Sequence, residues 1–199
     1  MLPENRLSSK PVPSPFSGAT ATALLSRVDD YEDGPVALQD PSQGLQFQRW
    51  RARAVAGQVL LSAPNYPETV LIDGSFVADI SIAFDNNANL YYVWTAEGIT
   101  RLRWFNTAIS AYDVMQLPTG IRTPKLTLDD KRPTQSGAND VLLFYIGKDN
   151  KLYHRRQRDR FAIEILLSDG PYISIERAGM NTGLRVQWLL TRGDPNANI

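Results

Sequence analysis

The chain has 199 residues, in which 21 lysines and arginines balance 21 aspartates and glutamates, and it contains no cysteine. The absence of cysteine excludes disulfides and thiolate metal sites, and the zero net charge gives no general argument for binding nucleic acid or an anionic membrane. No apolar run reaches the roughly 18–20 residues of a membrane-spanning helix, and residues 1–18 lack the apolar centre of a signal peptide. We therefore expect one domain without a membrane span, made in the cytoplasm.

The N-terminal part differs in composition from the rest. Residues 1–18 hold three prolines within five positions, and proline lacks a donor for a sheet ladder and favours extended backbone. This predicts an extended arm that is either disordered or docked on a neighbouring subunit. Residues 19–199 are expected to form a single β-rich domain, which begins with a short helix over residues 19–28 and an acidic turn over residues 29–34.

Most of the remaining sequence consists of short runs rich in β-branched and aromatic residues, separated by turn-forming clusters. In chain order, strands are expected at Leu45–Ala52, Gln58–Leu61, Val70–Asp73, Phe76–Phe84, Leu90–Trp94, Ile99–Phe105, Tyr112–Leu117, Asp140–Ile146, Lys151–Gln157, Phe161–Leu167, Tyr172–Glu176 and Leu184–Leu190. Turns are expected at Ala56-Gly57, Asp73-Gly74, residues 85–89, residues 96–98 and residues 147–150, and the prolines in residues 63–67 predict a loop.

Two segments, residues 79–120 and 129–170, resemble each other at an offset of about 50 residues. Each contains a strand, a turn, a polar strand with arginines, a break, a closing strand and a glycine turn, LPTG ending at Gly120 or LSDG ending at Gly170. A repeat of this length is typical of propeller blades, although two meanders of one sandwich would look alike. We predict an all-β fold of meander sheets, either propeller-like blades or a β-sandwich. Exposed edges of a partial propeller need covering, which predicts a homo-oligomer.

Few residues suggest catalysis. Asp129 and Asp130 are adjacent, and adjacent residues of a strand point to opposite faces, so they converge on a substrate only if Glu97 or Glu164 completes the pair. Accepting hydrogen bonds from turn amides or pairing with arginines is the favoured role. His154 is the only histidine, which excludes a metal site built on several histidines. No nucleotide-binding or nucleophile motif is present, so we predict no catalytic residue, cofactor or metal site.

Two acidic turns have the carboxylates of a possible calcium site. Residues 85–89 match the first ligand positions of a calcium-binding loop, but Leu90 stands where a glycine is needed and Ala96 where a glutamate is needed. A hairpin turn is therefore favoured there. Residues 29–34 have no accompanying ligand pattern and are expected to form a solvated loop.

The strongest local positive charge lies in residues 151–160. In a strand these charges divide between two faces, with Arg155 beside Tyr153 on one face and Arg156 beside His154 on the other. Buried or inter-subunit ion pairs are favoured, ahead of a carbohydrate contact and of nucleic-acid binding. The four tryptophans and eight tyrosines are expected to form core, with a sugar-binding platform as the alternative, for which Trp104 is the candidate.

A longer pattern resembles structural proteins of tailed bacteriophages and prophages. It covers roughly Leu126–Trp188: an Asp-Asp pair before a proline, an Asn-Asp pair leading into an apolar strand, a polar hairpin, an RDRF-E run and a closing strand. Its residues are Asp129, Asp130, Pro133, Asn139, Asp140, Leu152, Tyr153, Arg158, Asp159, Arg160, Phe161, Glu164, Gly179, Met180, Asn181, Leu184, Arg185 and Gln187. The resemblance implies a non-enzymatic part of the virion tail, such as a tube end, nozzle, baseplate or fibre-attachment ring.

Three functions remain open from the sequence. The first is a structural subunit of a phage tail that contacts copies of itself and other tail proteins, located in the virion and made in the host cytoplasm. The second is a carbohydrate- or receptor-binding β module of a tail that contacts a host surface glycan. The third is a small β-propeller hydrolase, which would need the carboxylates of Asp129, Asp130 and Glu164 to converge.

Overall fold

The computed structural model describes residues 50–55, 57–63, 66–74, 76–85, 89–129, 140–180 and 186–193. Within these residues the protein is all-β, as the sequence predicted, and its only helical segment is a short 3-10 helix, η2 (Gln157–Asp159). No helix in the described part of the chain is long and apolar enough to cross a bilayer. The predicted arm, the short helix, the acidic turn at residues 29–34 and the start of the first expected strand lie outside the described residues.

Thirteen described strands form four antiparallel sheets. The first sheet contains β1 (Arg51–Val55), β2 (Gln58–Ala63) and β3 (Tyr66–Ile72). The second contains β4 (Val77–Phe84), β5 (Leu90–Ala96), β6 (Ile99–Asn106) and β7 (Ala111–Gln116). The third contains β8 (Arg122–Asp129), β9 (Asp140–Ile146), β10 (Leu152–Arg156) and β11 (Ile165–Ser168). The fourth contains β12 (Tyr172–Met180) and β13 (Val186–Arg192).

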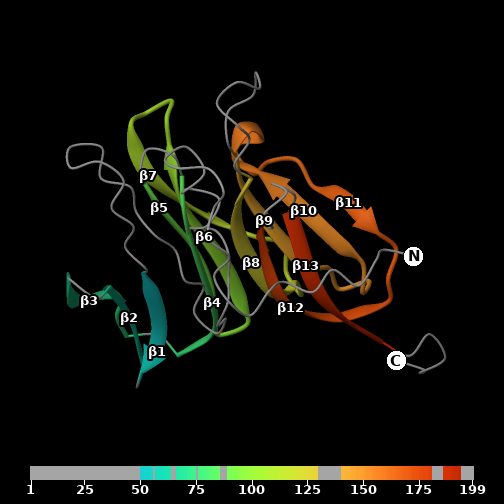
Figure 1. Ribbon diagram of the computed structural model, residues 1–199, viewed down its shortest axis with the longest axis horizontal. Helices are drawn as coiled ribbons and strands as arrows, with labels where there is room; N and C mark the ends of the chain where they lie inside the picture. The colour runs from blue at the N-terminus through green and yellow to red at the C-terminus, as the bar shows by residue number, and fades with distance from the viewer. Residues whose placement is uncertain are drawn as a thin grey trace, which may run out of the picture.

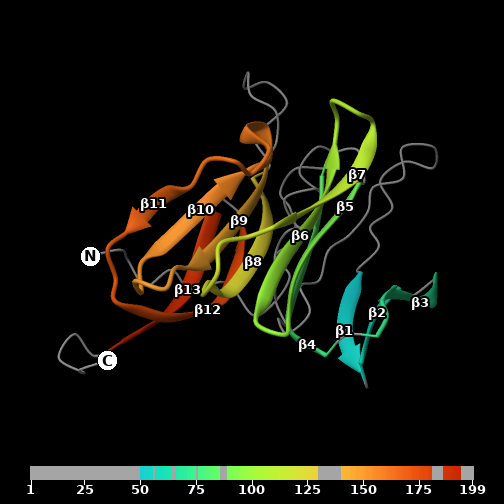
Figure 2. The ribbon, with the colours of Figure 1, turned by 180° about the vertical axis from the view of Figure 1, so that it is seen from behind.

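The four sheets pack on one another in chain order and form a row. Figure 1 and Figure 2 show the first, second and third sheets following one another across the molecule, while the fourth overlaps the third in both views. The first strand of each sheet lies beside the first strand of the next, because β1 packs against β4, β4 against β8 and β8 against β12. Successive meanders joined at their first strands are arranged like the blades of a β-propeller. The row is open: no sheet closes into a barrel, and among the described strands no comparable packing joins the first sheet to the fourth.

Each gap between neighbouring sheets is filled by a hydrophobic core. The first gap holds Ala52, Val59, Leu61, Ile80, Ile82 and Phe84. The second gap holds Tyr91, Val93, Leu102, Trp104, Leu143, Tyr145 and Phe161. The third gap holds Leu142, Phe144, Ile146, Leu152, Tyr172 and Ile175. Strands β4 and β5 of the second sheet and β9 and β10 of the third therefore contact a core on both faces, and β9 is buried at every residue because alternate side chains enter the second and third gaps.

The repeat predicted from the sequence corresponds to the second and third sheets. Both are four-stranded meanders, β4-β5-β6-β7 and β8-β9-β10-β11, that occupy consecutive places in the row. The glycines that close the two LxxG sequences lie just after them, and both adopt left-handed backbone, with φ of +81° at Gly120 and +74° at Gly170. A side chain at Gly170 would also meet the carbonyl oxygen of Asn150 at 2.3 Å, so glycine is required where the chain leaves the third sheet.

The hairpin predictions are confirmed by the strand pairing. Val55 pairs with Gln58 across the turn at residues 56–57, and Ala96 pairs with Ile99 across a turn in which Glu97 and Gly98 both have positive φ. Residues 85–89 join β4 to β5. The buried carboxylate of Asp85 accepts hydrogen bonds from the backbone N–H and side-chain amide of Asn89, which fixes the turn.

Two local predictions were wrong. Residues 66 and 67, which were expected in a loop, belong to β3. Pro67 is tolerated there because β3 is an edge strand, so the backbone N–H that proline lacks is not needed for pairing with a further strand. The turn expected at Asp73-Gly74 is present, with φ of +76° at Gly74, and it leads from the first sheet to the second. The expected strand Phe161–Leu167 is shortened to β11, because Arg160 and Phe161 adopt left-handed backbone and the Phe161 ring enters the second gap.

Candidate functional site

The third sheet carries a polar network on the face that it turns toward the second sheet. Tyr145 on β9 donates a hydrogen bond from its hydroxyl to Glu164 Oε2, and the hydroxyl accepts one from Arg155 Nε on β10 at 2.8 Å. The Arg155 guanidinium also donates to Glu164 Oε2 at 3.2 Å and to the carbonyl oxygen of Phe161 at 2.7 Å. Arg155 thereby holds the segment before β11, and with it Glu164, against the sheet.

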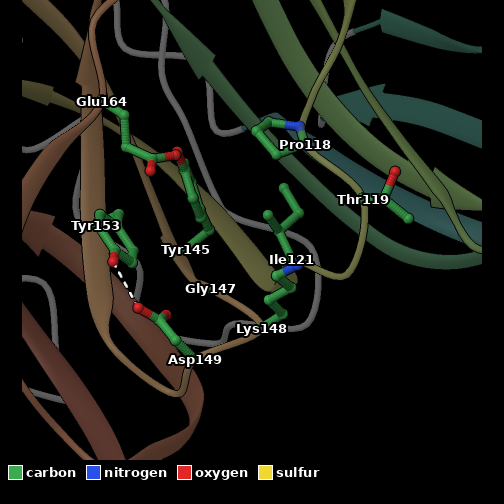
Figure 3. A pocket seen from close by; sticks show the side chains of 9 residues that line it. All are labelled: Pro118, Thr119, Ile121, Tyr145, Gly147, Lys148, Asp149, Tyr153 and Glu164. Atoms are coloured by element: carbon green, nitrogen blue, oxygen red, sulfur yellow. Dashed lines mark hydrogen bonds between the residues drawn. The ribbon is translucent and has the colours of Figure 1, made fainter.

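Beside this network lies a cleft of about 420 Å³ between the second and third sheets. The connection from β7 to β8 supplies one wall, and the end of β9, the following turn, β10 and Glu164 supply the other (Figure 3). The lining residues are Pro118, Thr119, Ile121, Tyr145, Gly147, Lys148, Asp149, Tyr153 and Glu164. The cleft is mixed in character, with two tyrosines and two apolar side chains beside three charged groups.

Tyr153 and Asp149 are fixed by each other. The Tyr153 hydroxyl donates to Asp149 Oδ2 at 2.7 Å, as the dashed line in Figure 3 shows, and the Tyr153 ring stacks on that of Tyr145 with centroids 6.0 Å apart. Gly147 leaves room for this contact, because a Cβ there would lie 2.8 Å from the Tyr153 ring. The orientation of Tyr153 therefore depends on a glycine and a carboxylate of the preceding turn.

These contacts shift the ionisation of the cleft residues. The hydrogen bond to Asp149, followed by desolvation, raises the pKa of Tyr153 to about 12. Partial desolvation raises the pKa of Asp149, but hydrogen bonds from Tyr153 and from the backbone N–H of Lys151 outweigh it and leave that pKa below its ordinary value. Burial, and then the hydrogen bond to Glu164, raise the pKa of Tyr145. At neutral pH both tyrosines are therefore uncharged.

Of the two candidate catalytic carboxylates whose side chains the structure describes, Glu97 and Glu164, only Glu164 lies in the cleft. Glu97 occupies the turn between β5 and β6, and its left-handed backbone gives it a turn-forming role. Asp129 ends β8, while its side chain and Asp130 lie outside the described residues. The described residues therefore do not bring a pair of these carboxylates together.

The positive run at residues 151–160 forms ion pairs within the chain, most of them partly exposed, whereas buried or inter-subunit pairs were the favoured prediction. Arg156 Nε contacts Asp159 at 2.7 Å, and Lys151 Nζ contacts Asp169 at 3.0 Å. Arg155 pairs with Glu164, and Arg158 pairs with Asp140 at the start of β9. Asp140, Arg158 and Glu164 belong to the pattern that resembles phage structural proteins, so part of that pattern holds the third sheet together.

His154 and Trp104 have core environments. The His154 ring lies 5.9 Å from that of Phe144, and burial, followed by the charge of Arg156, lowers the pKa of His154. The described residues contain no group of three or more His, Cys, Asp or Glu that could hold a metal ion. Trp104 is only 6% exposed and packs edge-on against Phe161, so the suggestion of Trp104 as an exposed sugar platform was wrong.

Sequence reasoning missed most of the cleft. Residues 147–150 were expected to form a turn, but nothing in their spacing showed that residues 118–121, in the connection from β7 to β8, would face them. The sequence pointed to Glu164 as a candidate carboxylate and to Tyr153 only as a neighbour of Arg155 on one strand face. Comparison with known proteins gave no match to any family model, to any curated protein or to any solved structure.

Proposed function

We propose that the chain is a non-enzymatic structural subunit of a bacteriophage tail, which assembles by packing its first sheet against the fourth sheet of another copy. The observation that carries the proposal is the open row of sheets, in which each end sheet packs one face on its neighbour in the row. The resemblance of residues 126–188 to phage structural proteins supplies the biological setting.

The outward face of the first sheet is partly apolar. Ala52 and Leu61 point into the first gap, so Val55, Leu60 and Val70 point away from it, and Leu60 pairs with Val70 across β2 and β3. Val55 and Val70 are 40% and 52% exposed. Such a surface beside the edge strand β3 suits coverage by another sheet.

The outward face of the fourth sheet has a similar character. Tyr172 and Ile175 enter the third gap, whereas Ile173 is 52% exposed. Glu176 is also exposed and accepts a hydrogen bond from Thr191 of β13. The first and fourth faces are different surfaces, so a contact between them is head-to-tail, and repeated contacts of this kind close into a ring if the rotation permits.

Sedimentation of the full chain and of two single-face variants tests this assembly. Val70→Asp and Ile173→Asp each place a carboxylate on one proposed face, and an unpaired charge buried there costs about 3 kcal/mol or more, a loss of affinity of over ~100-fold. Both variants should dissociate the oligomer. Ile109→Asp is the matched control, because Ile109 is 62% exposed in the turn between β6 and β7 and lies on neither end sheet.

Oligomers that persist in both face variants would contradict the head-to-tail contact. A full chain that sediments as a monomer at every concentration would contradict self-assembly altogether. Detection of the chain in purified virions by mass spectrometry, in copies that are multiples of three or six, would support the tail assignment.

A further inference from the structure

The cleft between the second and third sheets has the groups of a ligand site rather than those of a packing defect. Its volume of about 420 Å³ lies within the range of small-molecule sites, about 300–1,000 Å³. It is lined by charged and aromatic side chains, which a packing void in a core is not. Its residues belong to neither of the two end faces, so its occupation is independent of the proposed assembly.

Several polar atoms of the cleft are available for a ligand. Every hydrogen bond that Glu164 accepts from the described residues ends on Oε2, which leaves Oε1 as an acceptor on a side chain that is 39% exposed. Lys148 is exposed and makes no ion pair with the described residues. Thr119 adds a hydroxyl on the opposite wall, as Figure 3 shows. The cleft thus offers an acceptor, a strong donor and a group that can act as either.

The cleft also offers a fixed aromatic ring and apolar side chains for contact with a ligand. Tyr153 is half-buried, and its ring is held from one side by Tyr145 and at its hydroxyl by Asp149. Pro118 and Ile121 add apolar surface on the opposite wall. A ring that is fixed in this way presents a flat apolar surface to a ligand at little conformational cost.

The charges of the cleft select the class of ligand. Lys148 and Asp149 have opposite signs, and the charge of Glu164 is balanced by Arg155 at 3.2 Å. The cleft therefore has no net charge that would favour an anion or a cation. A proline-rich peptide offers acceptors for Lys148 but few donors for Glu164 Oε1, whereas vicinal hydroxyls offer both.

We propose that this cleft binds a neutral saccharide, with the sugar ring lying on Tyr153, a hydroxyl donating to Glu164 Oε1 and a hydroxyl accepting from Lys148 Nζ. The volume admits a ligand of one or two sugar rings, so the terminal part of a larger glycan would be the bound element. In a tail subunit such a site would contact a glycan of the host surface.

Saturation-transfer NMR on the full chain, with a mixture of the methyl glycosides of glucose, galactose, mannose and N-acetylglucosamine, tests the proposal. We expect transfer to at least one glycoside, and an array of neutral glycans then identifies the preferred terminal sugar. Absence of transfer to all four glycosides and of retention on the array would overturn the proposal. So would retention of a proline-rich peptide in the same cleft with no saccharide bound.

Variants locate the binding. Lys148→Met removes the donor and Tyr153→Ala removes the ring, and each should weaken binding at least about tenfold, whereas Tyr153→Phe keeps the ring and should retain most of it. Glu164→Gln keeps an acceptor for Arg155 and should also weaken binding. Lys151→Met is the matched control, because its ammonium pairs with Asp169 outside the cleft, and it should bind like the parent chain. Binding that Lys148→Met and Tyr153→Ala leave unchanged, with both variants folded by circular dichroism, would refute this site.

Discussion

Replacement of Asp140 by alanine is expected to destabilise the third sheet more than any exposed ion pair would. Asp140 is 2% exposed at the first position of β9. Its carboxylate accepts a hydrogen bond from the backbone N–H of Arg158 at 3.1 Å and another from the Arg158 guanidinium. One buried carboxylate therefore ties the start of β9 to the η2 turn that follows β10.

The magnitude follows from these two contacts. A hydrogen bond to a charged group contributes about 1.5–3 kcal/mol, and the Arg158 pair adds at most about 1 kcal/mol because that side chain is 40% exposed. The Asp140→Ala variant should therefore lose about 2–4 kcal/mol of the free energy of unfolding. For a chain of this length, roughly 2–4 °C of Tm is lost per kcal/mol, so Tm should fall by roughly 5–15 °C.

Chemical denaturation followed by circular dichroism, at one fixed protein concentration, measures this loss. Asp169→Ala is the matched control, because it also removes an aspartate from an ion pair, but Asp169 is 82% exposed and the loss should stay below about 1 kcal/mol. If the two variants were equally stable, the buried Asp140 contact would not be holding the third sheet together. The structural role given to Asp140 and Arg158 would then be wrong.

Three further predictions concern other parts of the molecule. Gly170→Ala should lose more stability than Gly98→Ala, because both have left-handed backbone but only at Gly170 would the new Cβ meet a carbonyl oxygen at 2.3 Å; urea denaturation compares them. Trp104→Ala should cost about 3–5 kcal/mol, as expected for a fully packed core tryptophan, and a cost under 1 kcal/mol would contradict its burial. The hydrogen bond to Asp149 raises the pKa of Tyr153 to about 12 in the folded state. Its contribution to the free energy of unfolding is complete below the ordinary pKa near 10 and is lost as the pH rises from there to about 12. Tm should therefore fall less steeply between these pH values in Tyr153→Phe than in the parent chain, and parallel curves would refute the hydrogen bond to Asp149.

Strands were predictable where the local pattern and the environment agree. β9 was expected at Asp140–Ile146 and has those bounds, because a strand covered on both faces requires an unbroken apolar run. β6 was expected at Ile99–Phe105, and its side chains alternate, with Leu102 and Trp104 buried and Arg101 and Arg103 facing away from the core. In β6 the side-chain period carries the information, whereas in β9 it is carried by a short apolar run next to a turn cluster.

The failures concern features that depend on distant parts of the chain. Pro67 fits a strand only because β3 lies at a sheet edge, which is a property of the whole sheet. Phe161 leaves the expected strand because the second gap accepts its ring, and that gap is formed by another sheet. The cleft likewise joins Tyr153 to residues 118–121, which no local spacing relates.

The head-to-tail contact between end sheets is tested most directly by mixing the two single-face variants and weighing the products by native mass spectrometry. Val70→Asp retains an intact fourth-sheet face, and Ile173→Asp retains an intact first-sheet face. Each variant alone should be a monomer, and the mixture should give a 1:1 heterodimer that grows no further, because only one productive contact is left between them. A mixture that remains monomeric, or a variant that forms higher oligomers alone, would contradict the proposed assembly.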